Sequence, residues 1–218
     1  MEKIVRAFFG NTPTQPDPLH EPAFAEYLCR EFSFEERTGI FDRFRFGESR
    51  FDYLMRRILA KTLLKKVGCN LVLSPGVAFP HPETLEIGND VFIGAHAILQ
   101  GRRDGSCRIG NKVWIGAHCF FDTRDLIVGD FVGWGPGSKV LGSEHTADAP
   151  GKPIIATDLR IRPVRVHNNC DIGVNAVIMP GVTIGEGCII GAGAVVTKSI
   201  EAFHIAAGVP AKTVRKRA

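Results

Sequence analysis

Aliphatic side chains recur at every sixth residue in the C-terminal half of the chain. From residue 166 to residue 196 this spacing continues without a gap, and mostly small residues stand four positions after each aliphatic one (Val166, Ile172, Ile178, Ile184, Ile190, Val196; then Cys170, Ala176, Val182, Cys188, Ala194, Ile200). A period of six fits neither the 3.6-residue helix nor a long strand that alternates every second residue. It fits a short strand followed by a tight turn, repeated many times, which is the pattern of a solenoid.

Earlier parts of the chain show the same period with one slip. Aliphatic or aromatic residues occupy the repeat positions from residue 87 onward, and glycine follows many of them (Ile87, Ile93, Ile109, Ile115, Phe121, then Val128, Trp134, Val140). Glycine at these places suits turns with a positive φ or a close approach of two backbones. The pattern predicts a parallel β-solenoid whose aliphatic side chains fill the interior, with each coil contacting only its neighbours.

Two segments interrupt the period. Residues 100–108 form a short excursion, whereas residues 142–165 form a long loop between two regular stretches of the repeat. A long loop inside a compact repeat is more often functional than idle. We therefore expect functional side chains in the second segment.

The N-terminal part of the chain has a different organisation, because only three of the 24 glycines precede residue 68. Residues 11–22 are rich in proline and predict an extended arm. Apolar residues at helical spacing predict an amphipathic helix over residues 48–67, closed by Gly68 as its C-cap. The opposite face of this helix is basic and is predicted to be solvated (Arg56, Arg57, Lys61, Lys65, Lys66). These differences divide the chain into an arm and helical segment, 1–69, and a solenoid domain, 70–218.

Composition and charge add information mainly at the C-terminus. The chain has 218 residues, of which 44% are hydrophobic and 23% charged, as in a globular domain of ordinary size. Its formal net charge of +4 lies entirely in residues 198–218, which hold five basic residues and one acidic residue, because the rest of the chain has 22 of each. A nucleic-acid-binding protein usually carries a basic stripe across its fold. The local patch instead favours a small anionic ligand or a solvated tail, and no nucleic-acid partner is expected.

Cysteine usage and hydropathy bear on the compartment and on metals. The N-terminus has no secretory apolar region, and the longest apolar stretch has nine residues, so neither export nor a membrane span is predicted. The six cysteines form no CxxC pair and no close cysteine or histidine ligand spacing, which argues against a disulfide framework and a metal site. Cys119, Cys170 and Cys188 stand at the small inward position of the repeat and are predicted to be core thiols. We expect a cytoplasmic protein without a metal.

The repeat [Ile/Val]-Gly-x-x-[Ala/Val/Cys]-x resembles that of a known family. Together with the segments PGVTIGEGCIIGAGAVVTKSI (180–200) and AAGVPAKTVRK (206–216), it resembles the hexapeptide-repeat acyltransferases, and most of all the galactoside, maltose and related sugar O-acetyltransferases. The resemblance covers residues 70–216. It implies a left-handed parallel β-helix with three hexapeptides per coil, a helical N-terminal segment and a C-terminal extension. It also implies a homotrimer with active sites between subunits and acetyl-CoA as the co-substrate.

The resemblance implies a general base on the long loop, at His145. An imidazole with an ordinary pKa of about 6.5 is largely neutral at pH 7 and can take a proton from a sugar hydroxyl as that hydroxyl attacks. The attack on the thioester forms a tetrahedral oxyanion, which needs a backbone N–H donor. Glu144 stands beside this histidine and is a candidate to orient it or to bind the acceptor. Asp122 and His118 are further candidates for acceptor binding.

Several coenzyme-binding positions follow from the same resemblance. Ala192 matches a position whose backbone meets the pantetheine arm, and Thr197 and Lys198 match the pair that follows it. Lys212 and Arg215 match basic positions that meet the phosphates, for which charged donors are suited. The family pattern places Pro210 beside the adenine, and it places a serine where this chain has Val174, so that only the Val174 backbone can contribute.

Other departures from the family pattern leave the acceptor open. Asp171 stands where the sugar acetyltransferases often have a tryptophan that lines the coenzyme arm. Ile115 replaces an asparagine near the acceptor, and Thr146 replaces the proline that usually follows the catalytic histidine. The saccharide specificity of the family therefore does not transfer to this chain.

More than one function is compatible with these residues. The first is acetylation of a saccharide hydroxyl, for example in a precursor of a surface polysaccharide, and the nearest alternatives are N-acetylation of a nucleotide-linked amino sugar and acetylation of an antibiotic. A zinc-dependent hydratase is more remote, because the histidines at 96, 118, 145 and 167 lack the close pair that the carbonic anhydrases of this fold use. A non-catalytic solenoid would bind no coenzyme.

Overall fold

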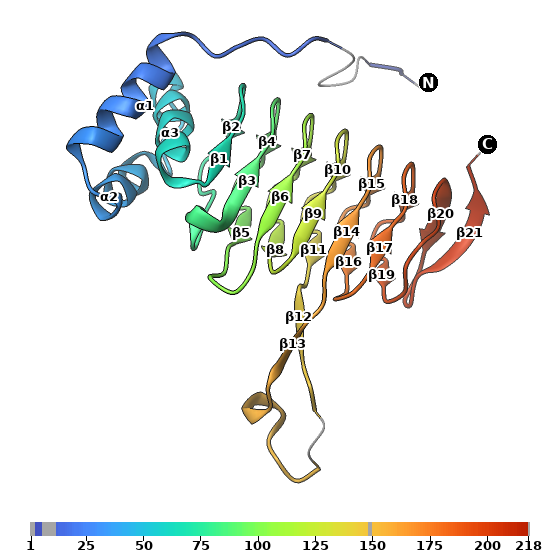
Figure 1. Cartoon of the computed structure of the whole chain (residues 1–218). Coiled ribbons are helices and arrows are strands. Elements are labelled where there is room, and N and C mark those ends of the chain that lie inside the picture. Colours follow the sequence, from blue (N-terminus) through green and yellow to red (C-terminus); the bar gives the residue numbers. More distant parts are fainter. Residues whose placement is uncertain (1–2, 6–11, 148–149, 218) are drawn as a thin grey trace.

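The computed structural model describes residues 3–5, 12–147 and 150–217 and consists of a β-helix with helices at one end (Figure 1). Three parallel sheets form the sides of the β-helix, and consecutive strands of the chain pass from one sheet to the next. The left-handed parallel β-helix that the sequence predicts is therefore confirmed. We call the three sheets I, II and III, and we call the rows of turns between them the I–II, II–III and III–I edges.

The strands of the three sheets are short and regularly placed. Sheet I contains β1 (Lys66–Val67), β3 (Leu85–Ile87), β6 (Cys107–Ile109), β9 (Leu126–Val128), β14 (Val164–Val166) and β17 (Thr183–Ile184). Sheet II contains β2 (Val72–Leu73), β4 (Phe92–Ile93), β7 (Trp114–Ile115), β10 (Gly133–Trp134), β15 (Asp171–Ile172), β18 (Ile189–Ile190), β20 (His204–Ala207) and β21 (Lys212–Lys216). Sheet III contains β5 (Ile98–Gln100), β8 (Phe120–Asp122), β11 (Lys139–Val140), β16 (Val177–Ile178) and β19 (Val195–Val196). All pairings within these sheets are parallel except that of β20 with the terminal strand β21.

The repeat positions form the core, as the six-residue period predicts. The aliphatic run from Val166 to Val196 is at most 1% exposed. The predicted core thiols are confirmed as well, because Cys119, Cys170 and Cys188 are all at most 2% exposed. Burial raises the pKa of the Cys170 thiol to about 11, so this sulfur stays protonated at neutral pH and is a packing group.

Three helices cover the N-terminal end of the β-helix (Figure 1): α1 (His20–Glu31), α2 (Phe34–Phe44) and α3 (Arg50–Leu63). The sequence analysis predicted only the last of them and placed its end too late. Helix α3 starts with a capping box between Ser49 and Asp52 and ends at Leu63, because the next residues pair with sheet I as β1. Gly68 is therefore not a helix cap. It lies in the first turn of the β-helix, where a Cβ would come within 2.6 Å of the Gly88 carbonyl carbon.

The predicted basic face is solvated only at Lys65 and Lys66, which follow α3 and are exposed. The prediction is wrong for the three basic residues within the helix. Arg56 is fully buried and donates hydrogen bonds to the carbonyl oxygens of Leu73 (2.8 Å), Phe44 (2.7 Å) and Gly47 (2.6 Å). Arg57 forms an ion pair with the buried carboxylate of Glu21 on α1, and Lys61 forms one with Asp17. These side chains join the helices to each other and to the first coil.

The predicted arm extends only as far as residue 18, because α1 starts at His20; residue 11 lies outside the described residues. Residues 12–17 follow the I–II edge of the first coils. Asn70 donates a hydrogen bond to the Gln15 carbonyl, and Lys112 donates one to the Thr12 carbonyl.

One hairpin leaves the β-helix at the III–I edge. It contains the antiparallel strands β12 (Ser143–His145) and β13 (Leu159–Ile161), joined by a segment with a 3-10 helix (Ile154–Ala156), and it projects away from the solenoid (Figure 1). A second 3-10 helix (Pro82–Thr84) precedes β3. None of the described helices has the length and apolar character that crossing a membrane requires.

Candidate active site

His145 lies on strand β12 of the projecting hairpin, opposite Leu159. Its Nδ1 lies 3.1 Å from the carbonyl oxygen of Thr157, which lies just before strand β13. A carbonyl oxygen can only accept, so this contact requires the hydrogen on Nδ1 and leaves the lone pair on Nε2. The Thr157 hydroxyl donates to the Ile154 carbonyl (2.7 Å), which fixes the turn that presents this acceptor. The hairpin therefore holds the imidazole in the tautomer that a general base needs.

Glu144 is next to His145 in sequence, but it does not orient the histidine within the chain. Successive side chains of a strand point to opposite faces. The Glu144 carboxylate lies 3.3 Å from Arg162 and 3.9 Å from Arg160, both at the β13 side of the hairpin. Contact between the Glu144 carboxylate and the acceptor substrate stays a prediction.

Asp122 is a buried part of the base of the hairpin. It is 8% exposed, and its Oδ2 accepts a hydrogen bond of 3.0 Å from the Ser143 hydroxyl. The same hydroxyl accepts a hydrogen bond of 2.8 Å from Arg124, which is also 8% exposed. Asp122 Oδ1 has no hydrogen bond among the described residues, and Arg102 is 3.8 Å away. The geometry makes Asp122 an anchor of the hairpin rather than an open acceptor contact.

The predicted coenzyme residues Val174 and Ala192 occupy equivalent places in successive turns of the II–III edge. Both contact a neighbouring coil: the Val174 carbonyl accepts a hydrogen bond of 2.8 Å from the Gly193 N–H, and Gly173 packs against the Ala192 backbone. Lys212 lies at the same edge, because its register partner Ala207 contacts Gly191. Both Val174 and Ala192 are exposed at this edge.

Arg215 lies on the outer face of sheet II. Its register partner is Ile205, which continues through Ile189 to Asp171, so that Arg215 and Asp171 stand in one row across the sheet. Thr197 and Lys198 instead occupy the III–I edge, the edge from which the hairpin with His145 also leaves. The structure thus distributes the predicted site residues over two edges and the outer face of sheet II and does not bring them into a single cleft.

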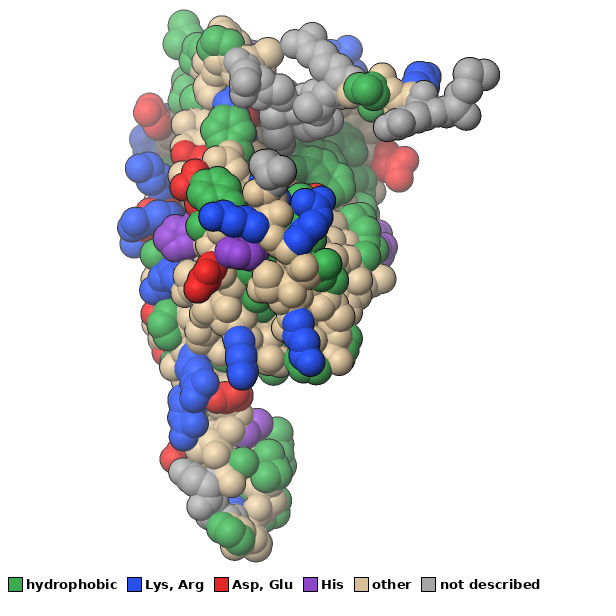
Figure 2. All heavy atoms as spheres, turned by 90° about the vertical axis from the view of Figure 1, so that its right-hand side faces the viewer, with side chains coloured by type: hydrophobic (Ala, Val, Ile, Leu, Met, Phe, Trp, Pro, Cys, Tyr) green, Lys and Arg blue, Asp and Glu red, His purple; other side chains and the backbone are tan. Residues whose placement is uncertain are grey.

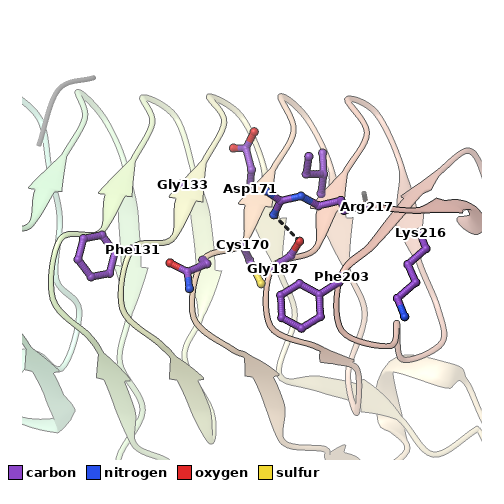
Figure 3. A pocket seen from close by; sticks show the side chains of 10 residues that line it. Phe131, Gly133, Cys170, Asp171, Gly187, Phe203, Lys216 and Arg217 are labelled. Carbon is purple, nitrogen blue, oxygen red and sulfur yellow. Dashed lines mark hydrogen bonds between the residues drawn. The ribbon is translucent and has the colours of Figure 1, made fainter. Parts of the chain in front are cut away.

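A groove of about 770 Å³ runs over sheet II and the I–II edge, at the end of the chain that carries the net charge (Figure 3). Asp171 lies in it together with Phe131, Phe203, Lys216 and Arg217, and Arg217 donates a hydrogen bond of 2.6 Å to the Gly187 carbonyl. Sequence reasoning did not assign the last four residues. Both phenylalanines adopt a positive φ, which is uncommon for a bulky residue. The sequence pattern does not predict this conformation. This groove places two aromatic side chains and two cations beside Asp171.

The hairpin presents exposed apolar side chains around its end (Figure 2). They have exposed fractions between 39% and 82% (Ile154, Ile155, Leu159, Ile161). An isolated two-stranded hairpin is only marginally stable in water, and exposed apolar groups of this kind mark interaction surfaces. His145 is therefore carried by an element that is suited to packing against another molecule.

His118, the remaining predicted acceptor residue, lies on the II–III edge, where its ring stacks on His96 at 5.3 Å between centroids. Neither histidine belongs to a group of three metal-binding side chains, and no such group exists within residues 3–5, 12–147 and 150–217. The donor set of a zinc hydratase is thus not assembled in the described chain.

Comparison with known proteins identifies the family. The family described as bacterial transferase hexapeptide (six repeats) matches residues 163–198. The galactoside O-acetyltransferase of Escherichia coli is 34% identical over 167 residues, which are 74% of this chain and 68% of that enzyme. The Mycobacterium tuberculosis protein Rv3034c, named as a probable acetyltransferase, is 36% identical over 141 residues, 64% of this chain and 47% of that protein. The chain spans about half the length of two of the curated relatives it matches, 46% and 47%.

Among solved structures, a mutant of AntD, an N-acyltransferase from Bacillus cereus in complex with dTDP-4-amino-4,6-dideoxyglucose and coenzyme A, superposes with a TM-score of 0.65. It is 25% identical, and the match covers 75% of this chain and 89% of that chain.

Proposed function

The chain belongs to the hexapeptide-repeat acetyltransferases, and from this membership we propose that it transfers the acetyl group of acetyl-CoA to a hydroxyl group of a saccharide. The observation that carries the proposal is the hydrogen bond from His145 Nδ1 to the Thr157 carbonyl. It leaves Nε2 as a base on an exposed hairpin, in the loop that interrupts the repeat. Residues 70–218 form the catalytic domain in this proposal, and residues 1–69 cover its end.

The reaction is a direct transfer. His145 Nε2 takes the hydroxyl proton as the hydroxyl oxygen bonds the thioester carbonyl carbon. The resulting tetrahedral oxyanion is stabilised by backbone N–H donors, to which Val174 can contribute only its main chain. When the carbon–sulfur bond breaks, the thiolate of CoA leaves and takes the proton from the imidazolium. The repeat cysteines form no acyl intermediate, because their thiols are buried in the core.

The coenzyme is assigned to residues of two edges. Val174 and Ala192 hold the pantetheine arm through their backbones, and Lys212 and Arg215 bind phosphates, with Pro210 beside the adenine. Thr197 and Lys198 complete the site from the III–I edge. A charged donor suits a phosphate oxygen, and the net charge of +4 is concentrated in this part of the chain.

A homotrimer explains why these residues lie apart in one chain. The hairpin with His145 and the edge with Thr197 and Lys198 would face the II–III edge of a neighbouring copy, which carries Val174 and Ala192. The exposed apolar residues of the hairpin supply the contact surface. Each active site would then contain residues of two copies.

A second acceptor class is favoured by one observation. The superposed AntD structure contains a nucleotide-linked amino sugar and coenzyme A, so acetylation of an amine on such a sugar is the alternative to a hydroxyl acceptor. Two further candidate acceptors are an antibiotic and a cytoplasmic precursor of a surface polysaccharide.

The test combines coenzyme binding with an acceptor panel. CoA at about 100 times its Kd should stabilise the protein by roughly 2.7 kcal/mol, which a thermal shift measures directly. Acetyl transfer is then assayed with pyranosides, nucleotide-linked amino sugars and aminoglycoside or chloramphenicol-type antibiotics. Absence of a thermal shift at millimolar CoA, with no transfer to any acceptor, would show that the chain is a non-catalytic solenoid.

A further inference from the structure

The residues with a positive φ on the I–II edge form a regular column, which we call the I–II column. It has one member in each of seven successive turns, in chain order (Asn70, Asp90, Lys112, Phe131, Asn169, Gly187, Phe203). The backbone N–H of each member after the first donates a hydrogen bond of 2.7–2.9 Å to a carbonyl of the preceding coil. The β-helix therefore fixes the spacing of these residues along the edge, at about 4.8 Å per coil, the usual distance between neighbouring strands.

The first coil of this edge binds a segment of the same chain, residues 12–17, which we call the strap. The Asn70 side-chain amide donates a hydrogen bond of 2.8 Å to the Gln15 carbonyl, and the Asn70 backbone N–H donates one of 2.9 Å to the Asp17 carboxylate. The other oxygen of this carboxylate accepts a hydrogen bond of 2.5 Å from Lys61 Nζ. An acidic side chain and a main-chain carbonyl of the strap are therefore both bound at this coil.

The next two coils bind the strap with the same kinds of group. Thr14 donates the hydrogen of its hydroxyl to the Asp90 carboxylate. Lys112 donates a hydrogen bond of 2.6 Å to the Thr12 carbonyl, and its ammonium also lies 5.9 Å from the centre of the Phe131 ring. The strap thus follows the edge from the first coil to the third, where Lys112 also contacts the next member of the I–II column.

The remaining four members of the I–II column line the groove of about 770 Å³ (Figure 3). Phe131 and Phe203 lie at opposite sides of it and are 44% and 47% exposed. The Phe203 ring packs over Gly187, where a Cβ would come within 2.6 Å of the ring. Four successive members span three spacings of ~4.8 Å, or about 14 Å, which is the length of about five residues of polyproline II at ~3.1 Å each. The groove can therefore hold an extended peptide about as long as the strap.

The polar groups of the groove are of the kinds that bind the strap. Asn169 supplies a side-chain amide, Asp171 a carboxylate and Lys216 an ammonium. The Asn169 amide donates one hydrogen to Glu186 at 3.2 Å and has a second hydrogen to donate. Lys216 forms no ion pair within the part of the chain that the structure describes. Main-chain carbonyls, N–H groups and an acidic side chain of a peptide would all find partners here.

The aromatic rings and the unpaired cation specify the composition of this peptide. Segments in the polyproline II conformation bind grooves lined by aromatic side chains, because proline fixes the extended conformation before binding. An ammonium without a partner favours a carboxylate. The strap itself has this composition, since residues 12–18 contain three prolines and one aspartate (Pro13, Pro16, Pro18, Asp17).

We propose that the groove between Phe131 and Phe203 docks an extended, acidic and proline-containing segment of a partner protein. The segment lies along the I–II edge, in line with the strap and bound by the same kinds of group. The proposed contact between copies of this chain uses the III–I and II–III edges, so the I–II edge of each copy stays accessible. This interaction surface is independent of the acceptor and of the coenzyme.

A labelled peptide tests the docking. The probe is a fluorescein-labelled peptide with the sequence of residues 12–18, TPTQPDP, and the control peptide has asparagine in place of the aspartate. Fluorescence anisotropy with the full chain should show saturable binding of the probe and about 3-fold weaker binding of the control peptide at low ionic strength, as expected for an exposed ion pair. This difference should shrink in Lys216→Gln. No saturable binding of the probe, or equal binding of the two peptides to the wild type, would overturn the proposal.

Variants locate the bound peptide. Phe131→Asn and Phe203→Asn remove the rings and keep the backbone, because asparagine tolerates a positive φ and Asn169 adopts one in the same column. Each should raise the Kd of the probe about 5-fold, as expected for the loss of an aromatic contact. His81→Asn is the matched control, since it removes an exposed ring at a positive φ on the III–I edge, and it should leave the Kd unchanged. Equal Kd values for all three variants would place the peptide outside the groove and reject the docking site.

Two further measurements separate this groove from other surfaces of the chain. Saturating CoA should leave the Kd of the probe unchanged, whereas displacement of the probe by CoA would assign the groove to the coenzyme. Analytical ultracentrifugation should give the same oligomeric state for the wild type and Phe203→Asn. Loss of an oligomer in that variant would make a second copy of the chain the occupant, and either result would overturn docking of a partner protein.

Discussion

The Arg124 guanidinium donates a hydrogen bond of 2.8 Å to the hydroxyl of Ser143, the first residue of the strand that carries His145. The Ser143 hydroxyl in turn donates a hydrogen bond of 3.0 Å to Asp122 Oδ2, so it both accepts and donates a hydrogen bond. Two close backbone contacts tighten the same place, since a Cβ on Gly142 would lie 2.8 Å from the Arg124 carbonyl oxygen and one on Gly105 would lie 2.8 Å from the Arg124 Cα. The base of the hairpin is therefore fixed to the β-helix.

Removal of the Ser143 hydroxyl should loosen the hairpin without removing the base. Ser143→Ala removes both hydrogen bonds of this hydroxyl, each worth roughly 0.5–1.5 kcal/mol. We expect it to lower kcat by about 10-fold while the KM for acetyl-CoA stays the same. Ser143→Thr keeps the hydroxyl and should recover most of the turnover. Equal kcat values for the alanine variant and the wild type would mean that the hairpin is positioned by its other contacts.

His145→Ala should fold and bind CoA like the wild type but lose turnover by ~10²–10⁴-fold, the usual contribution of a general base. Steady-state rates with acetyl-CoA and a thermal shift with CoA measure the two properties separately. His167→Ala is the control, because this exposed histidine lies in a turn between sheets I and II, away from the hairpin. Turnover within a few-fold of wild type in His145→Ala would remove this histidine from the mechanism.

Replacing the proposed phosphate-binding cations should weaken CoA in a way that depends on salt. Lys212→Gln and Arg215→Gln should each raise the Kd for CoA roughly 5- to 10-fold at low ionic strength, and the difference from wild type should shrink as salt screens exposed charges. Calorimetric titration at several salt concentrations gives this dependence.

Arg103→Gln is a matched control for this charge change, since Arg103 is an exposed cation on the short excursion between β5 and β6. It should leave the Kd unchanged. If all three variants weaken CoA equally, the effect comes from net charge and the assignment of Lys212 and Arg215 is wrong.

The β-helix could be predicted because its cause is local. Each coil repeats the same inward aliphatic and small positions, so a search for a period of six finds both the core and the two interruptions. The missed helices have weaker patterns. In α2 only Phe41 is buried, which leaves little hydrophobic period, although the capping box between Ser33 and Glu36 could have indicated where the helix begins.

The site could be predicted only in part, because its geometry depends on contacts between distant residues. The interruption of the repeat indicated His145. The atom that sets its tautomer is the backbone carbonyl oxygen of Thr157, just before β13, and a backbone contact of this kind cannot be predicted from residue types. The sequence predicted Asp122 and Glu144 as candidate acceptor contacts, and the fold gives their carboxylates partners in Ser143 and Arg162.

The buried Arg56 allows a prediction about stability, because its guanidinium supplies hydrogen bonds to three main-chain carbonyls from α2, the following segment and β2. In Arg56→Met the apolar volume is largely kept but these acceptors lose their donor, and an unsatisfied buried polar group costs about 1–3 kcal/mol. Burial also lowers the pKa of Arg56, as expected for a cation that is removed from water. We expect Arg56→Met to reduce the free energy of unfolding by about 2–5 kcal/mol, measured by urea denaturation. Arg43→Met, at an exposed position of α2, should change it by less than about 0.5 kcal/mol, and similar stability of the two variants would contradict a structural role for Arg56.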